Sequence, residues 1–108
     1  TPLYSSAASD VYKRQVIKAS TGAVVSSFIP PGGNCRSLSF IGSFLCSGNS
    51  ATGIVTVFNP TTLVVHGTFA APGSGSARAE GMAYNPATNE FFIANQSENI
   101  IYVVRVTL

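Results

Sequence analysis

The sequence repeats itself, and the spacing of that repeat is the strongest constraint on the fold. Residues 16–28 align with residues 57–69, and Pro31-Gly32 aligns with Pro72-Gly73 in the connection that follows. The alignment continues in three further segments, with 37–40 over 81–84, 44–49 over 91–96 and 54–57 over 100–103. The offset between the copies drifts from 41 to 47 residues. A period of about 40–45 residues with four short strands is typical of a β-propeller, in which each repeat forms one blade.

Short apolar segments bounded by turn residues predict the strands. We expect one four-stranded unit and three strands of the next, over 38–41, 43–47, 53–58 and 63–69, then over 82–85, 90–95 and 100–106. The second strand of each unit is apolar without alternation, as is typical of a strand buried on both faces. Asn59-Pro60 and Asn85-Pro86 indicate turns, because Asn bonds backbone two residues on and Pro presets φ. The predicted fold class is all-β, with about two four-stranded antiparallel blades of an incomplete β-propeller.

Residues 1–15 are set apart from this fold. Residues 5–15 can be written in codons as a transposase-type library adapter, and residues 1–4 fit the tail of that adapter followed by a sample index. The alternative is a polar N-terminal tail with a basic Lys13-Arg14 pair. We exclude residues 1–15 as an adapter artefact that is expected to be disordered. Residues 16–108 are then one β-propeller fragment of metagenomic origin, with blade strands in about 16–28, 36–69 and 80–106.

The composition of residues 16–108 excludes several classes of function. The charged residues there are Lys18, Arg36, Arg78, Arg105, Glu80, Glu90 and Glu98. This segment is nearly neutral, so the formal net charge of +2 for the whole chain does not predict nucleic acid or anionic membranes as partners. No apolar run approaches the roughly 20 residues that span a bilayer. The low charge and the many Ser, Thr and Asn residues favour a secreted or cell-envelope location.

The C-terminal repeat resembles a known class of propeller repeats. Residues 80–95 read Glu-Gly-Met-Ala-Tyr-Asn-Pro-Ala-Thr-Asn-Glu-Phe-Phe-Ile-Ala-Asn, and with residues 99–103 they resemble the YVTN and NHL repeats. Those repeats share a small-residue inner strand, an Asn/Asp-Pro turn and an apolar strand that ends in Ala/Thr-Asn. The resemblance covers most of 16–108 and implies a propeller of the kind found in bacterial surface proteins, protein-binding scaffolds and some lactonase-like enzymes. The preceding repeat departs from it, with Arg36-Ser37 in place of Glu80-Gly81.

One candidate metal site follows from this resemblance. Lactonase-like relatives hold a divalent cation with a Glu at the start of an innermost strand and with Asn and Asp from other blades. Carboxylate and carboxamide oxygens suit such ions. Glu80 and Asn95 match this pattern for Ca²⁺ or another divalent cation, but residues 16–108 contain no Asp. The alternatives for Glu80 are an ion pair with Arg78 and a solvated loop charge. Asn95-Gln96-Ser97 also matches an N-glycosylation acceptor.

The other reactive side chains predict no site. His66 is the only histidine, and it lies in an expected outer strand with no partner nearby in sequence, so we expect it to face solvent. With residues 42–43 as a two-residue turn, Cys46 lies opposite Ser39. Cys35 is then too far along the strand for a disulfide with Cys46. No catalytic residue and no bound cofactor are predicted.

Two functions of different classes remain open. The first is an interaction scaffold in an extracytoplasmic protein, which binds a protein or small molecule at the channel mouth. The second is a propeller hydrolase or lactonase with a divalent-metal site in the central channel. Arg36 in the place of an acidic residue and the absence of Asp favour the scaffold. In both cases the first partners are the missing propeller blades of the parent chain.

Overall fold

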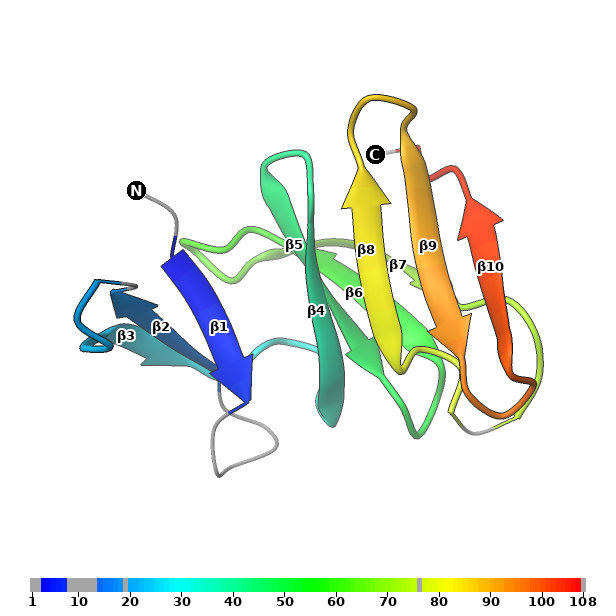
Figure 1. The fold of residues 1–108 in the computed structure, drawn as a ribbon, viewed down its shortest axis with the longest axis horizontal. Coiled ribbons are helices and arrows are strands. Elements are labelled where there is room, and N and C mark those ends of the chain that lie inside the picture. Colours follow the sequence, from blue (N-terminus) through cyan, green and yellow to red (C-terminus); the bar gives the residue numbers. More distant parts are fainter. Residues whose placement is uncertain (1–2, 8–13, 19, 76, 108) are drawn as a thin grey trace.

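The computed structural model describes residues 3–7, 14–18, 20–75 and 77–107, which form three antiparallel sheets (Figure 1). The first sheet has the strand order β1–β2–β3, the central sheet β4–β5–β6–β7 and the last sheet β8–β9–β10. The strands are β1 (Leu3–Ala7), β2 (Arg14–Lys18), β3 (Val24–Phe28), β4 (Cys35–Ile41), β5 (Phe44–Asn49), β6 (Ile54–Phe58), β7 (Val65–Ala70), β8 (Gly81–Asn85), β9 (Glu90–Asn95) and β10 (Ile100–Val104). This architecture confirms the predicted all-β class. Within the described part, no helix is long and apolar enough to cross a membrane.

The pairing of the first sheet repeats that of the central sheet. Val16 pairs with Ser26 in the β2–β3 hairpin, and the residues 41 positions later, Val57 and Gly67, pair in the β6–β7 hairpin. Each hairpin also has a register shift at the same place, directly after Val16 and directly after Val57. A bulge at the same position of two hairpins is a feature of the repeat rather than a local accident. The internal repeat is therefore structural.

The N-terminal segment differs from the disorder expected for residues 1–15. Leu3–Ala7 forms β1 and pairs antiparallel with β2, which gives the backbone of β2 a second neighbour besides β3. Backbone donors and acceptors of a strand are satisfied by such pairing. Residues 1–2 and 8–13 lie outside the described residues. The adapter origin of residues 1–15 stays a prediction.

The Asn-Pro turns have the predicted geometry, and they explain where one strand begins. Asn59 Oδ1 accepts hydrogen bonds from the backbone N–H of Thr61 (2.8 Å) and Thr62 (3.0 Å), and Asn85 Oδ1 accepts one from Ala87 (3.0 Å). Leu63 has a φ of 63° and donates its N–H to the Asn59 carbonyl (2.8 Å). Leu63 thus belongs to the turn, so β7 starts at Val65 and the predicted start at residue 63 is wrong.

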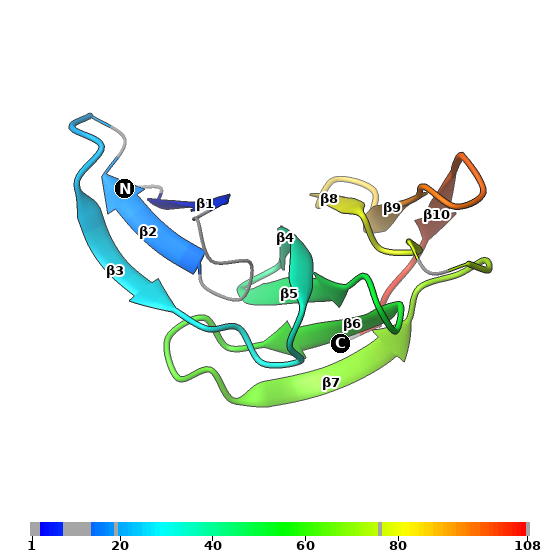
Figure 2. The ribbon, with the colours of Figure 1, turned by 90° about the horizontal axis from the view of Figure 1, so that it is seen from below.

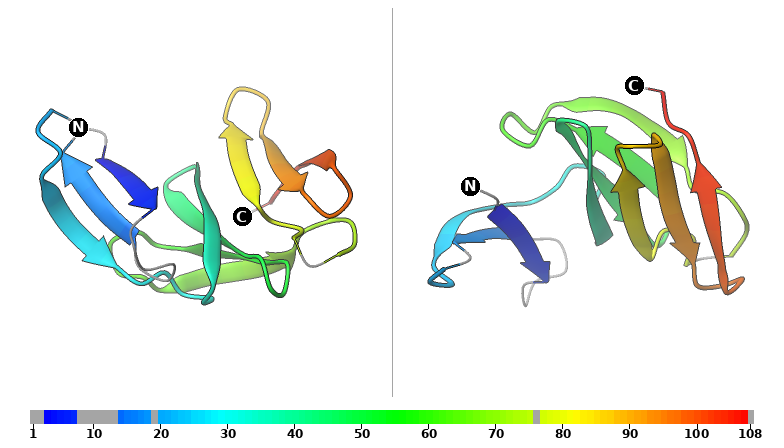
Figure 3. Two further views of the ribbon diagram at one scale, coloured as in Figure 1. Left: turned by 60° about the horizontal axis from the view of Figure 1, so that its bottom comes forward. Right: turned by 45° about the horizontal axis from the view of Figure 1, so that its top comes forward.

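The core lies between the central and last sheets, which follow one another side by side in chain order (Figures 2 and 3). Val55 and Val57 of β6 are buried there against Phe91 and Ile93 of β9. Phe69 of β7 meets Phe91 edge-on, with ring centroids 6.2 Å apart. Packing of one sheet face on the next is the arrangement that propeller blades require.

Candidate functional site

The first part of the site is an asparagine that joins two neighbouring sheets. Asn49, at the end of β5, accepts hydrogen bonds on Oδ1 from the backbone N–H of Ala51 (2.9 Å) and Thr52 (3.1 Å). Its Nδ2 donates to the carbonyl of Gly32 (3.0 Å), in the connection from the first sheet to the central sheet. One carboxamide thus shapes its own turn and also holds the preceding connection, because it offers both an acceptor and donors.

A second asparagine repeats this arrangement between the central and last sheets. We call the junction of two neighbouring sheets a seam. Asn95 ends β9 and is buried, and its Nδ2 donates to the carbonyls of Ser74 (3.1 Å) and Pro72 (3.5 Å) and to Glu98 Oε1 (2.9 Å). Its Oδ1 accepts the backbone N–H of Glu98 (3.0 Å). Because the amide nitrogen is buried and bonded, the acceptor in the 95–97 sequon is inaccessible in the folded chain. We call Asn49 and Asn95 the seam asparagines.

The strand register corrects the repeat alignment by one residue. Leu45 pairs with Phe40 and Phe91 pairs with Tyr84, so Leu45 is the counterpart of Phe91. The predicted alignment of residues 44–49 with 91–96 is therefore wrong by one position, since both second strands begin with a similar apolar run. The corrected alignment brings the two seam asparagines into register.

Each seam asparagine holds a connection in which glycine is required. Gly32 and Gly73, which the sequence aligns, have φ of 99° and 91°, a region that favours glycine. A Cβ on Gly32 would lie 2.5 Å from Thr56 Oγ1, and a Cβ on Gly73 would clash with Glu98 and with the amide of Asn95. Both connections therefore run too close to the next sheet for any side chain.

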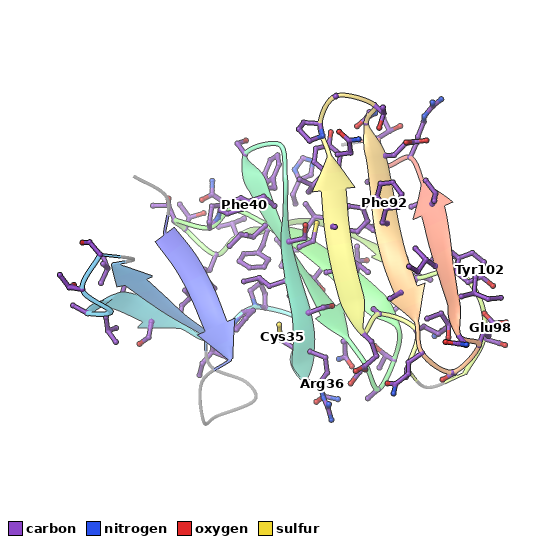
Figure 4. The ribbon with its side chains drawn as sticks, viewed as in Figure 1. Cys35, Arg36, Phe40, Phe92, Glu98 and Tyr102 are labelled. Carbon is purple, nitrogen blue, oxygen red and sulfur yellow. The ribbon has the colours of Figure 1, made fainter. Side chains whose placement is uncertain are left out.

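A carboxylate next to the second seam asparagine adds charge to the last sheet. Glu98 accepts a hydrogen bond from the Tyr102 hydroxyl (2.7 Å), and both side chains lie at the edge of the last sheet (Figure 4). This bond holds the pKa of Glu98 below its usual value; burial opposes the shift and bonds from Ser74 add to it. The same bond raises the pKa of Tyr102. In the central sheet the counterparts of Tyr102 and Glu98 are Thr56 and Thr52, so the carboxylate of this pair has no equivalent there.

The two predicted metal ligands become backbone neighbours. Glu80 precedes Gly81, which pairs with Ala94, and Asn95 follows Ala94. The half-buried Glu80 donates its N–H to the Ala94 carbonyl (3.2 Å), whereas the carboxamide of Asn95 is bonded to the chain. Among the residues that the structure describes, no group of three or more His, Cys, Asp or Glu side chains could hold a metal ion. The metal site stays a prediction.

Two arginines lie close to the first residues of β4 and β8, the inner strands of the central and last sheets. Arg78 donates from Nη2 to the Thr52 carbonyl, and its guanidinium lies against Gly53 in the turn of the central sheet. Arg78 therefore links the last sheet to the β5–β6 turn. Arg36 is exposed on β4, where its side chain points away from the sheet (Figure 4).

The histidine and the cysteines lie where the sequence predicts. His66 is exposed on β7 and stacks on the Phe44 ring, with centroids 4.5 Å apart. Cys46 pairs with Ser39, as the turn length predicted, and the buried Cys35 donates from Sγ to the Ser37 carbonyl (3.3 Å). Burial raises the pKa of the Cys46 thiol to about 12, which makes it a poor nucleophile.

A groove of about 490 Å³ lies between β7 and the chain that follows β10. Its lining residues are Val57, His66, Gly67, Thr68, Phe69, Ala70, Pro72, Val104, Arg105, Val106 and Thr107. The size is within the range of small-ligand pockets, and most of the side chains are apolar. Sequence reasoning missed this groove. The available signal was Val104, a small residue at the repeat position where the central sheet has Phe58.

Comparison with solved structures supports the fold, whereas the two sequence comparisons find no match. No family model matches the sequence, and no curated protein matches it. The structure is similar to the β-propeller domain of Cps50 (Swd1) from Myceliophteria thermophila, with a TM-score of 0.57 and 19% identity over 91% of this chain and 31% of that chain. It is also similar to the WD40 repeats of RRP9, with a TM-score of 0.55 and 16% identity over 89% of this chain and 33% of that one.

These neighbours and the sheet order define the class of the chain, which is a β-propeller fragment. It spans about a third of the length of each neighbour. At these identities the likeness concerns the fold alone, because one propeller fold serves many functions.

Proposed function

We propose that this chain is part of a larger β-propeller that acts as a binding scaffold in an extracytoplasmic protein. The repeats are of the YVTN or NHL type, which rests on the motif in residues 80–95. The ligand, a protein or a small molecule, binds at the channel mouth. There Arg36, in the inner strand β4, and Glu80, directly before the inner strand β8, place unlike charges at matching ends of two adjacent blades.

One observation carries the proposal that the ring is larger than this chain. Val55 and Val57 of the central sheet are 0% and 3% exposed because the last sheet packs on them. Their counterparts one blade later, Ile101 and Val103, are 67% and 50% exposed. The same face of the same repeat is thus apolar in both blades and has a covering blade in only one.

A further blade on Ile101 and Val103 would remove this exposure. Burying a side chain of this size stabilises by about 1.5–3 kcal/mol. Apolar faces that stay in water on a monomer favour association or aggregation. Further blades of the parent chain are therefore the first partners that we propose.

The alternative, a propeller hydrolase or lactonase with a divalent cation on Glu80 and Asn95, has weaker support. The carboxamide of Asn95 is used on both its oxygen and its nitrogen to hold residues 72–74 and 98. A cation at Asn95 Oδ1 would have to share this buried oxygen with the backbone N–H of Glu98. We therefore favour the scaffold.

The purified 108-residue chain tests the proposal. We expect it to be poorly soluble, to self-associate or to be partly folded, with strong binding of a dye that reports exposed apolar surface. The double variant Ile101→Glu/Val103→Glu should reduce dye binding and self-association without loss of the β-sheet circular dichroism signal. The matched control Ser43→Glu/Thr61→Glu adds the same charge in exposed turns and should change neither.

The contrary outcome is clear. A monomeric chain that binds no dye and melts in one sharp cooperative transition would contradict a missing blade. Light scattering gives the mass, and differential scanning calorimetry gives the cooperativity of the transition.

A further inference from the structure

The seam between the first and central sheets is closed by two aromatic rings. Phe28 of β3 meets Phe58 of β6 edge-on, with ring centroids 6.2 Å apart. Phe58 is fully buried. A pair of this kind fills the space between the outer strand of one blade and the third strand of the next.

The next seam has lost one of these rings. Its counterpart residues are Phe69 in β7 and Val104 in β10, and both line the groove. Val104 has the position of Phe58, since Phe91 pairs with Val104 as Leu45 pairs with Phe58. The groove is thus open at the place where the first seam holds a phenyl ring.

The edge of the groove is suited to backbone pairing. Five consecutive residues of β7, numbers 66–70, line it. Because successive side chains of a strand point to opposite faces, a run of five places the groove along the strand edge. β7 is the last strand of the central sheet and has no Pro and no charged residue, which are the usual devices that block pairing at an edge.

The charge of the groove lining is positive. Arg105 is the charged side chain among the described lining residues, which also include His66. A carboxylate would complement the guanidinium and could form a bidentate pair with it. Among the residues that the structure describes, none of the lining side chains is acidic.

We propose that this groove binds an extended segment of a partner protein that inserts an aromatic side chain between Phe69 and Val104. An acidic residue two positions from that aromatic, on the same face of the extended segment, pairs with Arg105. The backbone of the segment adds to the edge of β7 that pairs with no other strand among the described residues. This mode of recognition takes affinity from main-chain hydrogen bonds and specificity from one pocket. The proposal rests on the scaffold function and adds a second contact surface to the channel mouth, at the opposite edge of the central sheet.

A short peptide tests the proposal on the 108-residue chain with Ile101→Glu/Val103→Glu, which is expected to reduce self-association and alters no residue of the groove lining. The probe is the capped peptide acetyl-Val-Glu-Phe-Val-Glu-Thr-amide, labelled for fluorescence anisotropy. One matched peptide has Ala in place of Phe, and another has Gln in place of both Glu residues. We expect both changes to weaken binding, the first by at least about tenfold, which corresponds to about 1.4 kcal/mol. His66 is the only histidine of the chain and lines the groove. The NMR resonances of its imidazole protons therefore report on the groove during a titration.

Two variants of the chain complete the test. Val104→Phe should fill the groove as Phe58 fills the first seam, and it should abolish peptide binding while leaving the circular dichroism spectrum unchanged. Arg105→Gln should weaken binding of the acidic peptide to the level of the Gln peptide. Lys18→Gln removes an equal charge from β2 of the first sheet, which is not part of the groove lining, and should have no effect.

Several outcomes would overturn the proposal. One is an unmoved His66 resonance, and another is equal binding of the Phe and Ala peptides. A third is peptide binding that survives Val104→Phe. If Val104→Phe instead dissolves oligomers of the chain, the occupant is a second copy and not a partner segment. These readouts differ from the dye binding of the Ile101/Val103 face, so failure here leaves the larger ring untouched.

Discussion

The central and last sheets are two copies of one repeat, yet they differ in burial. Their second and third strands pair in the same register, and both third strands are rich in Ile and Val. Nearly all of β6 is buried, whereas most of β10 is exposed. In a repeat fold each unit contacts only its neighbours, so the neighbours decide what is buried. The amino-acid pattern alone is the same for a covered and an uncovered blade.

The largest expected effect comes from placing one charge at the same repeat position in each sheet. Val57→Lys would bury an ammonium group without a partner and should unfold the chain, a loss of about 4 kcal/mol or more. Val103→Lys places the charge in water and should change the free energy of unfolding by less than about 0.5 kcal/mol. Urea unfolding followed by circular dichroism measures both. Equal losses would mean that the two faces are equally buried.

A smaller effect is expected at the seam asparagines. Asn95→Ala removes a buried carboxamide together with its hydrogen bonds to the Ser74 carbonyl and the Glu98 N–H, and it should destabilise by about 2–3 kcal/mol. Asn49 is only partly buried and water can replace its bonds, so Asn49→Ala should cost about 1 kcal/mol. Chemical unfolding of both variants gives the comparison. A greater loss at Asn49 would show that burial does not rank the two seams.

The smallest effect is an acid dependence of stability that comes from Glu98 in the last sheet. The pKa of Glu98 is lowered in the folded chain, so its contribution is present above the ordinary value of 4.5 and is lost as the pH falls through the folded value. The pKa of Tyr102 is raised, so its contribution is present below 10.0 and is lost as the pH rises through its folded value. The Tm difference between the natural chain and Glu98→Gln should shrink as the pH falls below 4.5.

The control for this pH dependence is Thr56→Val in the central sheet. This variant removes a hydroxyl at the position that corresponds to Tyr102. The central sheet has Thr52, and no carboxylate, at the position that corresponds to Glu98. Its Tm difference from the natural chain should stay constant over the same acid range. An acid dependence that Glu98→Gln leaves unchanged would assign the titration to another group.

The sequence predicted the elements whose chemistry is local. The Asn59 and Asn85 turns follow from side chains that bond their own backbone, and the pairing of Cys46 with Ser39 follows from the length of one turn. Leu63 was missed because its left-handed φ depends on the turn before it rather than on its apolar side chain. Local patterns thus predicted strands well and strand ends less well.

The seams required contacts between distant residues, and these were harder to predict. The offset changes within the repeat, so an apolar run such as 91–93 can be aligned in two ways, and only the pairing with β8 selects one. The groove depends on the exchange of Phe58 for Val104, which becomes visible once the register is known. Glu80 and Asn95 were predicted as ligands of one cation, which stays a prediction. The engagement of Asn95 with residues 72–74 is a property of the fold that the sequence pattern did not indicate.

The buried thiol of Cys46 can report local opening of the central sheet. A thiol reagent needs access to the sulfur and needs the thiolate, and the folded chain supplies neither at neutral pH. Labelling of Cys46 can proceed only through an opening of the central sheet that lets solvent reach the sulfur. The rate of Cys46 labelling in the absence of denaturant therefore measures how often the central sheet opens locally. This labelling rate should fall when a further blade or a bound partner stabilises the central sheet.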